Sequence, residues 1–225
     1  MKQKLKGKKK MLIIIACIII SLLAVVAGRM LFLSSATTGK TITDYRYGKA
    51  ALLVIDIQED TLSMPQYSNS KELIHNINTS IEYAVENGME IIYIKQEFSN
   101  IFDSLLAGGM YKANSEGSKL SSQLLIKSDN IFSKLRSDSF SENNFEQYLI
   151  DNQIDTLFIV GADASACVYK TSLGGVSRGY HVVVLEDCLF SVDKNIQNKM
   201  LEQYKKDGIN VKNMGVFLQS ANNHQ

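Results

Sequence analysis

The stretch Leu157–Thr171, LFIVGADASACVYKT, decides the fold class of this chain. It opens with four consecutive apolar residues, Leu157–Val160, a pattern typical of a β-strand that is buried on both faces. Gly161 ends this run, and a stretch with helical character begins near Ser165. A buried strand followed directly by a helix is the repeating unit of parallel α/β sheets.

Cys167 is expected in the first turn of that helix. The free backbone N–H groups and the positive end of the helix dipole at such a position favour a thiolate over a thiol. The same N–H groups could hold the oxyanion that forms when the thiolate attacks a carbonyl group. The alternative is that Cys167 is a small buried hydrophobic residue, as most single free cysteines are. Its position alone favours the buried hydrophobic residue, and the rest of the chain reverses this preference.

The chain from Ala50 onward continues the alternation of strands and helices. Strands are predicted at Ala50–Ile55, Glu90–Lys95, Ile131–Lys134, Leu157–Val160, His181–Leu185 and Gly215–Leu218. Helices are predicted at residues 69–87, at Ser141–Gln153, from about Ser165, and at Val192–Lys206. This order predicts βαβ units with right-handed crossovers and a parallel sheet, whose chemistry collects at the carboxyl ends of the strands. Asp56, Lys134 and Cys167 each stand at or just after such an end.

The N-terminus has a different composition from the rest of the chain. Residues 1–10 contain six lysines and no acidic residue, and Met11–Gly28 contains 18 residues without a charge. Arg29 can snorkel to the lipid headgroups, so residues 11–33 are predicted as one transmembrane signal-anchor. The basic tail should stay in the cytoplasm, which places the rest of a single-pass cell-membrane protein outside.

Two other interpretations of this N-terminus remain open. Val25–Ala27 offers a small-residue site at which a signal peptide could be cleaved, and the protein would then be secreted. A lipoprotein signal ending at Cys17 has a short apolar lead-in, and the hydrophobic run continues past that cysteine. Residues 34–49 are polar and predict a linker, and residues 50–225 are long enough for one domain with its own core.

Charge and cysteine content exclude other classes of protein. Without the tail lysines, 18 basic residues remain against 23 acidic ones, so no nucleic-acid surface is expected. Cys17 lies in the predicted span, and Cys167 and Cys188 are too few for a disulfide framework, although an outside location would permit one bond. The oligomeric state is open, with a homo-oligomer as one alternative.

Three blocks of sequence resemble those of a known family. They are LLVIDIQ (Leu52–Gln58), KLRSDSF (Lys134–Phe140), and GADASACVYKT (Gly161–Thr171) with the downstream RGYHVVVLED (Arg178–Asp187). In this order and spacing they resemble the isochorismatase-like cysteine hydrolases, the superfamily of nicotinamidase and N-carbamoylsarcosine amidohydrolase. The resemblance implies a three-layer α-β-α fold with a mostly parallel six-stranded sheet.

The resemblance also implies roles for individual residues. Cys167 would be the nucleophile, Asp56 the group that takes the thiol proton, and Lys134 the cation that holds Asp56 ionised and lowers the pKa of the thiol. The backbone N–H groups of Asp163 and Cys167 would form the oxyanion hole, and a cis peptide bond would join Ala162 to Asp163. The substrate would be a small molecule, cleaved at an amide or ureido C–N bond through a thioester.

Differences from the family limit what the resemblance implies about a metal site and about the substrate. Nicotinamidases carry an Asp-x-His-x-x-His metal motif, but the region from Lys95 to Lys134 has no histidine, so no metal and no cofactor are expected. The irregular segment Phe98–Ser128 is expected to shape the pocket and leaves the substrate's identity open. Two alternatives remain: a membrane-tethered binding or scaffold module without turnover, and a redox-responsive protein in which Cys167 and Cys188 pair.

Overall fold

The computed structural model describes residues 2–42, 49–67 and 70–219 of the chain. These residues form two compact units, one that ends at Leu33 and one that begins at Ser34. The basic side chains before Gly7 and the C-terminal residues 220–225 lie outside the described part.

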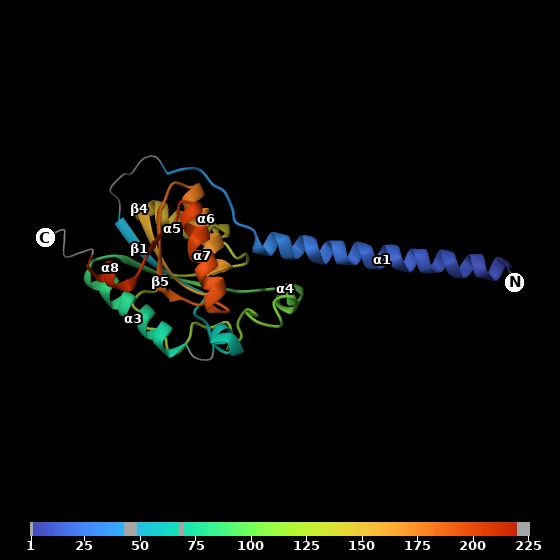
Figure 1. The fold of residues 1–225 in the computed structure, drawn as a ribbon, viewed down its shortest axis with the longest axis horizontal. Helices are drawn as coiled ribbons and strands as arrows, with labels where there is room; N and C mark the ends of the chain where they lie inside the picture. Colours follow the sequence, from blue (N-terminus) through green and yellow to red (C-terminus); the bar gives the residue numbers. More distant parts are fainter. Residues whose placement is uncertain (1, 43–48, 68–69, 220–225) are drawn as a thin grey trace. The chain divides into compact units, whose positions relative to one another are not determined.

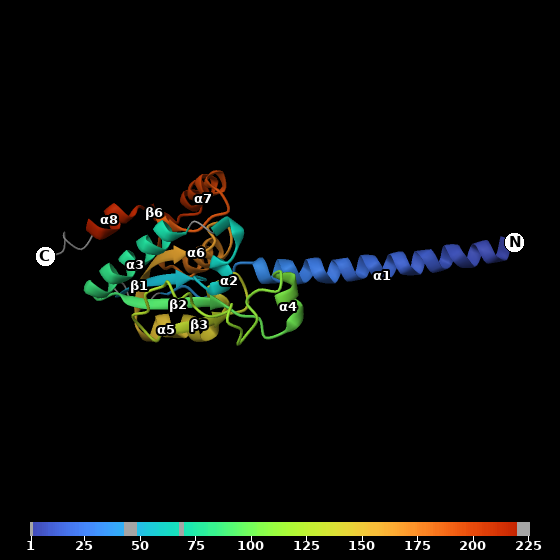
Figure 2. The ribbon, with the colours of Figure 1, turned by 90° about the horizontal axis from the view of Figure 1, so that it is seen from below.

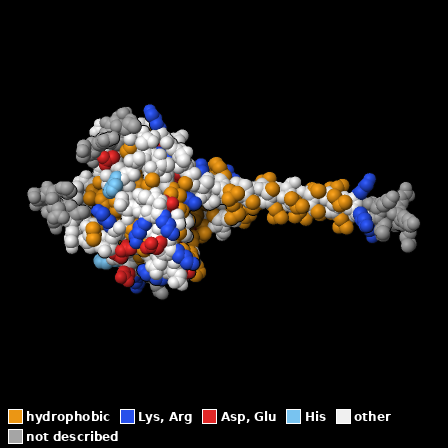
Figure 3. Space-filling view, turned by 45° about the horizontal axis from the view of Figure 1, so that its top comes forward, with side chains coloured by type: hydrophobic (Ala, Val, Ile, Leu, Met, Phe, Trp, Pro, Cys, Tyr) orange, Lys and Arg blue, Asp and Glu red, His pale blue; other side chains and the backbone are white. Residues whose placement is uncertain are grey.

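The first unit is a single helix, α1 (Lys2–Ser34). Its segment Gly7–Ser34 has 28 residues, contains an 18-residue window with a mean hydropathy of 3.1, and is long and apolar enough to cross a membrane. Apolar side chains such as Leu12 and Leu31 are 63% and 70% exposed, and Figure 3 shows hydrophobic side chains along the helix. A helix of this kind fits a membrane anchor or a signal sequence.

Within the described residues, the second unit is built on a six-stranded sheet in which each neighbouring pair of strands is parallel (Figure 1). The strands are β1 (Lys49–Ile55), β2 (Glu90–Gln96), β3 (Ile131–Lys134), β4 (Ile154–Gly161), β5 (His181–Leu189) and β6 (Asn210–Lys212). Their order in space is β3-β2-β1-β4-β5-β6, and Figure 2 shows β3 toward one edge and β6 toward the other. The predicted parallel α/β fold is therefore confirmed.

Helices cover both faces of the sheet and create two cores. The helices of this unit are α2 (Glu59–Leu62), α3 (Lys71–Glu86), α4 (Ile101–Leu106), α5 (Asn143–Asp151), α6 (Cys167–Ser177), α7 (Lys194–Lys206) and α8 (Met214–Gln219). Helices α5, α6 and α7 lie on one face of the sheet, and α3 and α8 lie on the other (Figure 1). Their apolar side chains pack into two separate cores. Strand β1 supplies Leu53 and Ile55 to the first core and Leu52 and Val54 to the second. This double burial explains why its sequence is a continuous apolar run rather than an alternating one.

One predicted strand is wrong. Residues Gly215–Leu218 belong to helix α8, and the last strand is β6, which lies just before it. Asn213 begins the helix, because its side chain accepts a hydrogen bond from the backbone N–H of Val216 at 2.9 Å. Met214, Phe217 and Leu218 then share one helical face that packs into the core beside α3. A short apolar run has no clear period, so it did not distinguish helix from strand.

The boundaries of the other elements differ from the predicted ones by a few residues. Helix α3 begins at Lys71, and position 69 of the predicted helix lies outside the described residues. The predicted irregular segment from Phe98 contains the short helix α4. Strand β5 continues to Leu189, four residues beyond its predicted end.

Residues 34–42, which we call the stem, contact the domain, although residues 34–49 were predicted as a linker. The backbone N–H and hydroxyl of Thr37 both donate to Asp138 Oδ2 at 2.6 Å. Arg136 donates to the backbone carbonyl of Ser35 at 3.1 Å and to its hydroxyl. The backbone N–H of Ile42 donates to the carbonyl of Arg178 at 2.9 Å. The stem therefore supplies hydrogen bonds to Asp138, which is fully buried.

We predict that the stem contributes to the stability of the domain. Thr37→Val removes a hydroxyl that bonds a buried carboxylate and should lower the free energy of unfolding by about 1–2 kcal/mol. Thr37→Ser keeps the hydroxyl and serves as the matched control. The chain has ten tyrosines and no tryptophan, so tyrosine fluorescence during urea unfolding would follow the transition. Equal midpoints for Thr37→Val and Thr37→Ser would show that this contact does not contribute.

Candidate active site

The fold brings Asp56, Lys134 and Cys167 together at the carboxyl edge of the sheet. Asp56 follows β1, Lys134 ends β3, and Cys167 begins α6 after β4. The chain moves from β1 to β2 and β3 on one side, and then returns to β4 on the other side of β1. The site therefore lies at the point where the strand order reverses, which is where open α/β sheets bind ligands.

Lys134 is the centre of the arrangement. Its Nζ lies 2.8 Å from Asp56 Oδ2, 2.7 Å from Gln96 Oε1 and 3.3 Å from Cys167 Sγ. Lys134 is 1% exposed and Asp56 is 3% exposed, so both charges are shielded from water. Burial by itself would lower the pKa of Lys134, but the charge of Asp56 and the hydrogen bonds to Asp56 and Cys167 act in the opposite direction, and the net shift is upward. The lysine is therefore held as an ammonium ion.

Two glutamines hold this lysine in place, and neither was predicted as a site residue. Gln96 contacts Lys134, and Gln58 supports Gln96. The side-chain amide of Gln96 donates to the backbone carbonyls of Lys134 and Leu135 at 3.0 and 2.6 Å, which leaves its oxygen facing Nζ. Gln58 accepts from the backbone N–H of Gln96 at 2.8 Å and donates back to its carbonyl at 3.0 Å. Gln58 belongs to the quoted LLVIDIQ block, and its position three residues after the predicted strand Ala50–Ile55 was the available signal in the sequence. Gln96 carried no signal in the sequence.

The position of Asp56 depends on a close approach between the backbones of β4 and β1. Asp56 has a φ of 54°, and its N–H donates to the carbonyl of Ile94 at 2.8 Å. Gly161 has a φ of +126°, and a Cβ there would lie 2.1 Å from the carbonyl oxygen of Ile55. Only glycine therefore lets β4 pass this close to the end of β1. Among the described residues, no hydrogen bond reaches the buried Asp56 Oδ1.

Cys167 sits at the N-terminus of α6 and is half-buried. Among the hydrogen bonds of the described residues, none uses the backbone N–H of Cys167 or of Asp163 as donor. Both of these N–H groups are thus available to an oxyanion. The peptide bond between Ala162 and Asp163 is cis.

The protonation state of the thiol differs from the sequence-based expectation. Burial and then the charge of Asp56 raise the pKa of Cys167 to about 12, although Lys134 opposes this shift. Lys134 therefore acts in the expected direction but does not dominate. The raised pKa favours the neutral thiol over the thiolate at rest.

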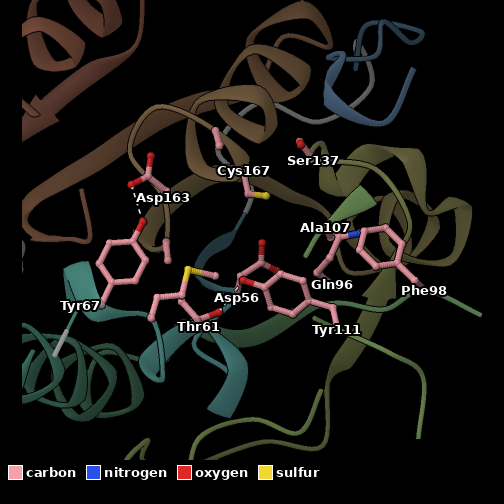
Figure 4. A pocket seen from close by; sticks show the side chains of 13 residues that line it. Asp56, Thr61, Tyr67, Gln96, Phe98, Ala107, Tyr111, Ser137, Asp163 and Cys167 are labelled. Atoms are coloured by element: carbon pink, nitrogen blue, oxygen red, sulfur yellow. Dashed lines mark hydrogen bonds between the residues drawn. The ribbon is translucent and has the colours of Figure 1, made fainter. Parts of the chain in front are cut away.

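A cavity of about 260 Å³ opens beside the thiol (Figure 4). Its described lining residues are Asp56, Thr61, Met64, Tyr67, Gln96, Phe98, Ala107, Tyr111, Ser137, Ala162, Asp163, Ala166 and Cys167. Phe98, Ala107 and Tyr111 come from the irregular segment, which was expected to shape the pocket. The cavity suits a small molecule with a few polar groups.

Cys188 does not join this site. It is fully buried in the core shared with α3 and α8, whereas Cys167 packs against the core on the opposite face of the sheet. Both cysteines are free. The predicted strand ends are adjacent, but the side chains belong to different faces, so the redox alternative gains no support. Among the described residues, no group of three His, Cys, Asp or Glu side chains could hold a metal ion.

A buried acid–lysine pair beside a thiol, on a parallel sheet, defines a site suited to nucleophilic catalysis. Comparison with known proteins agrees with this class. The family model described as "Isochorismatase domain" matches residues 50–215. The isochorismatase family protein 2A of Dictyostelium discoideum is 27% identical over 173 residues, which cover 76% of this chain and 78% of that protein.

Solved structures share the fold. An isochorismatase family protein from Desulfovibrio vulgaris has a TM-score of 0.68 at 19% identity and covers 76% of this chain and 96% of its own. The N-carbamoylsarcosine amidase from Thermoplasma acidophilum has a TM-score of 0.63 at 22% identity and covers 74% of this chain and 96% of its own. The chain belongs to the isochorismatase family, and we classify it as a hydrolase.

We predict that Asp56 controls the reactivity of the thiol. Asp56→Asn removes a negative charge that raises the pKa of Cys167, while Lys134 remains. The rate of alkylation by iodoacetamide depends on the thiolate fraction, so its pH profile should move to lower pH in this variant. Peptide mass spectrometry would measure Cys167 and the buried Cys188 in the same sample, with Cys167 reacting faster. An unchanged profile, or a shift to higher pH, would contradict this prediction.

Proposed function

We propose that this protein is a cysteine amidohydrolase that cleaves a C–N bond in a small amide or ureido compound through a thioester. The contact of one buried ammonium, Lys134 Nζ, with both Asp56 Oδ2 and Cys167 Sγ at the foot of a cavity carries the proposal. The structural likeness to N-carbamoylsarcosine amidase, an enzyme of amide chemistry, supports it.

The first half of the reaction forms the thioester. Asp56 Oδ1, which has no hydrogen-bond partner among the described residues, takes the thiol proton as Cys167 Sγ attacks the carbonyl carbon. The N–H groups of Asp163 and Cys167 hold the resulting oxyanion. Asp56 then passes its proton to the leaving nitrogen, the C–N bond breaks, and an amine or ammonia departs.

The second half releases the acid. Asp56, again ionised, takes a proton from water as that water attacks the thioester carbonyl. The C–S bond breaks, and the proton returns to sulfur, which restores the thiol. Lys134 stays an ammonium throughout, and its charge balances whichever of Asp56 or the sulfur is negative.

We predict that each member of the triad is necessary. Cys167→Ala, Asp56→Asn and Lys134→Ala should each lower kcat/KM by roughly 10³-fold or more, because each removes a different part of one proton-transfer unit. The effects should be strongly non-additive in the double variants. Cys188→Ala, which changes the opposite core, is the control that should retain activity.

Mass spectrometry tests the intermediate directly. Incubation with a panel of small primary amides and ureido compounds should add an acyl group to Cys167 and to no other residue. Turnover by Cys167→Ala would exclude this mechanism. Absence of both turnover and adduct across the panel would favour the scaffold alternative.

We also propose that α1 anchors the enzyme in the cell membrane, with the domain outside. The uncharged run from Met11 to Gly28 and the preceding lysines support this orientation. Secretion after cleavage near Ala27 is the competing outcome.

The orientation predicts exposure of the domain to external protease. Protease added to intact cells should remove the domain from the membrane fraction while a cytoplasmic control protein survives. A domain that is protected until lysis would contradict the orientation. A mature N-terminus near residue 28, identified by peptide mass spectrometry, would instead show cleavage.

A further inference from the structure

The charge of the cavity indicates what the substrate carries, an inference that rests on the proposed function. Among the described residues, the lining contains two carboxylates, Asp56 and Asp163, and no lysine, arginine or histidine. Asp56 is balanced by Lys134 at 2.8 Å, and the thiol of Cys167 is neutral at rest. The charge that remains in the cavity is that of Asp163.

Asp163 is held in place by neutral donors. Its Oδ2 accepts a hydrogen bond from the hydroxyl of Tyr67 at 2.7 Å (Figure 4). Its Oδ1 accepts from the backbone N–H and the hydroxyl of Ser165 at 2.7 and 2.5 Å. Burial and then the charge of Asp163 raise the pKa of Tyr67, which keeps this tyrosine a neutral donor. These bonds orient the carboxylate without cancelling its charge, and the half-buried side chain remains open to a ligand.

Aromatic rings complete the walls. Tyr67 lies on the side of Asp163, and Tyr111 and Phe98 lie on the other side of the thiol (Figure 4). The rings of Phe98 and Tyr111 meet edge to face, with centroids 6.4 Å apart. Aromatic faces carry negative potential and attract ammonium groups, whereas a carboxylate gains nothing from them.

We propose that the substrate carries a cationic group, such as an ammonium, and that Asp163 is a specificity-determining residue that recognises it. An anionic substrate would meet the carboxylate of Asp163 and aromatic side chains, with no basic partner among the described lining residues. The scissile carbonyl lies at Cys167, and the cation lies toward Asp163 and Tyr67. Small amides that carry an amine are therefore the expected substrate class.

Charged thiol reagents test the charge of the cavity without any knowledge of the substrate. Cys167 is treated with 2-aminoethyl and with 2-sulfonatoethyl methanethiosulfonate, and each rate is divided by the rate with a small free thiol. The ammonium reagent should react at least about tenfold faster, as expected for one nearby unit charge in a partly solvated site. Asp163→Asn should lower this ratio by about tenfold.

Asp129→Asn is the matched control for net charge, because Asp129 is exposed and does not line the cavity. It should leave the ratio of the two rates unchanged. Equal rates for the two reagents, or a ratio that Asp163→Asn does not change, would overturn the inference.

Turnover then separates this inference from the proposed function. β-Alaninamide, butanamide and succinamate are similar in size and carry an ammonium, no charge and a carboxylate, respectively. We expect kcat/KM to fall in that order, and Asp163→Asn to reduce the ratio between the first two. Hydrolysis that is equal for the three or best for succinamate overturns the cationic preference alone. Reagent selectivity without hydrolysis of any amide overturns the proposed function alone.

Discussion

The site depends on one buried ammonium ion. Removing a lysine side chain from water costs several kcal/mol unless partners replace the lost hydration. Lys134 finds three such partners in Asp56, Gln96 and Cys167, all within 3.3 Å of its Nζ. Because those partners arrive from β1, β2 and the start of α6, the charge can be buried only when the sheet is assembled. The contacts that make the buried charge of Lys134 tolerable are therefore the same contacts that place Cys167 beside it.

The balance of charges explains why an acid stands beside the thiol. Burial and Asp56 raise the pKa of Cys167, and Lys134 alone does not reverse this. A neutral thiol next to an ionised carboxylate keeps the resting site electrically balanced and delays the separation of charge until a carbonyl group is present to accept the sulfur. The electrostatics therefore favour general-base activation over a permanently reactive cysteine.

Different elements of the fold supply the cavity walls, Asp163 and the contacts of the stem. The irregular segment after β2 contributes Phe98 and Tyr111, which line the cavity. Among the described residues, neither of them forms a hydrogen bond with Lys134. The turn after β4 contributes Asp163, whose carboxylate accepts a hydrogen bond from Tyr67 and lines the cavity. The stem reaches the loop after β3 through Asp138, close in sequence to Lys134. The hydrogen bonds of the folded domain therefore begin within a few residues of the end of α1.

The sequence by itself determined the parallel α/β fold, the apolar N-terminal helix and the three side chains that meet at the carboxyl edge of the sheet. Continuous apolar runs such as Leu157–Val160 reflect burial on both faces, and the polar residues that follow strand ends must meet at one edge. Only the tertiary structure decided the rest. Gln96 comes from the middle of the chain and matters only because β2 lies between β1 and β3, while α8 is a helix because its face meets α3. The raised pKa of the Cys167 thiol and the hydrogen bond between Tyr67 and Asp163 depend on burial and on distances between distant residues, which local sequence patterns do not contain.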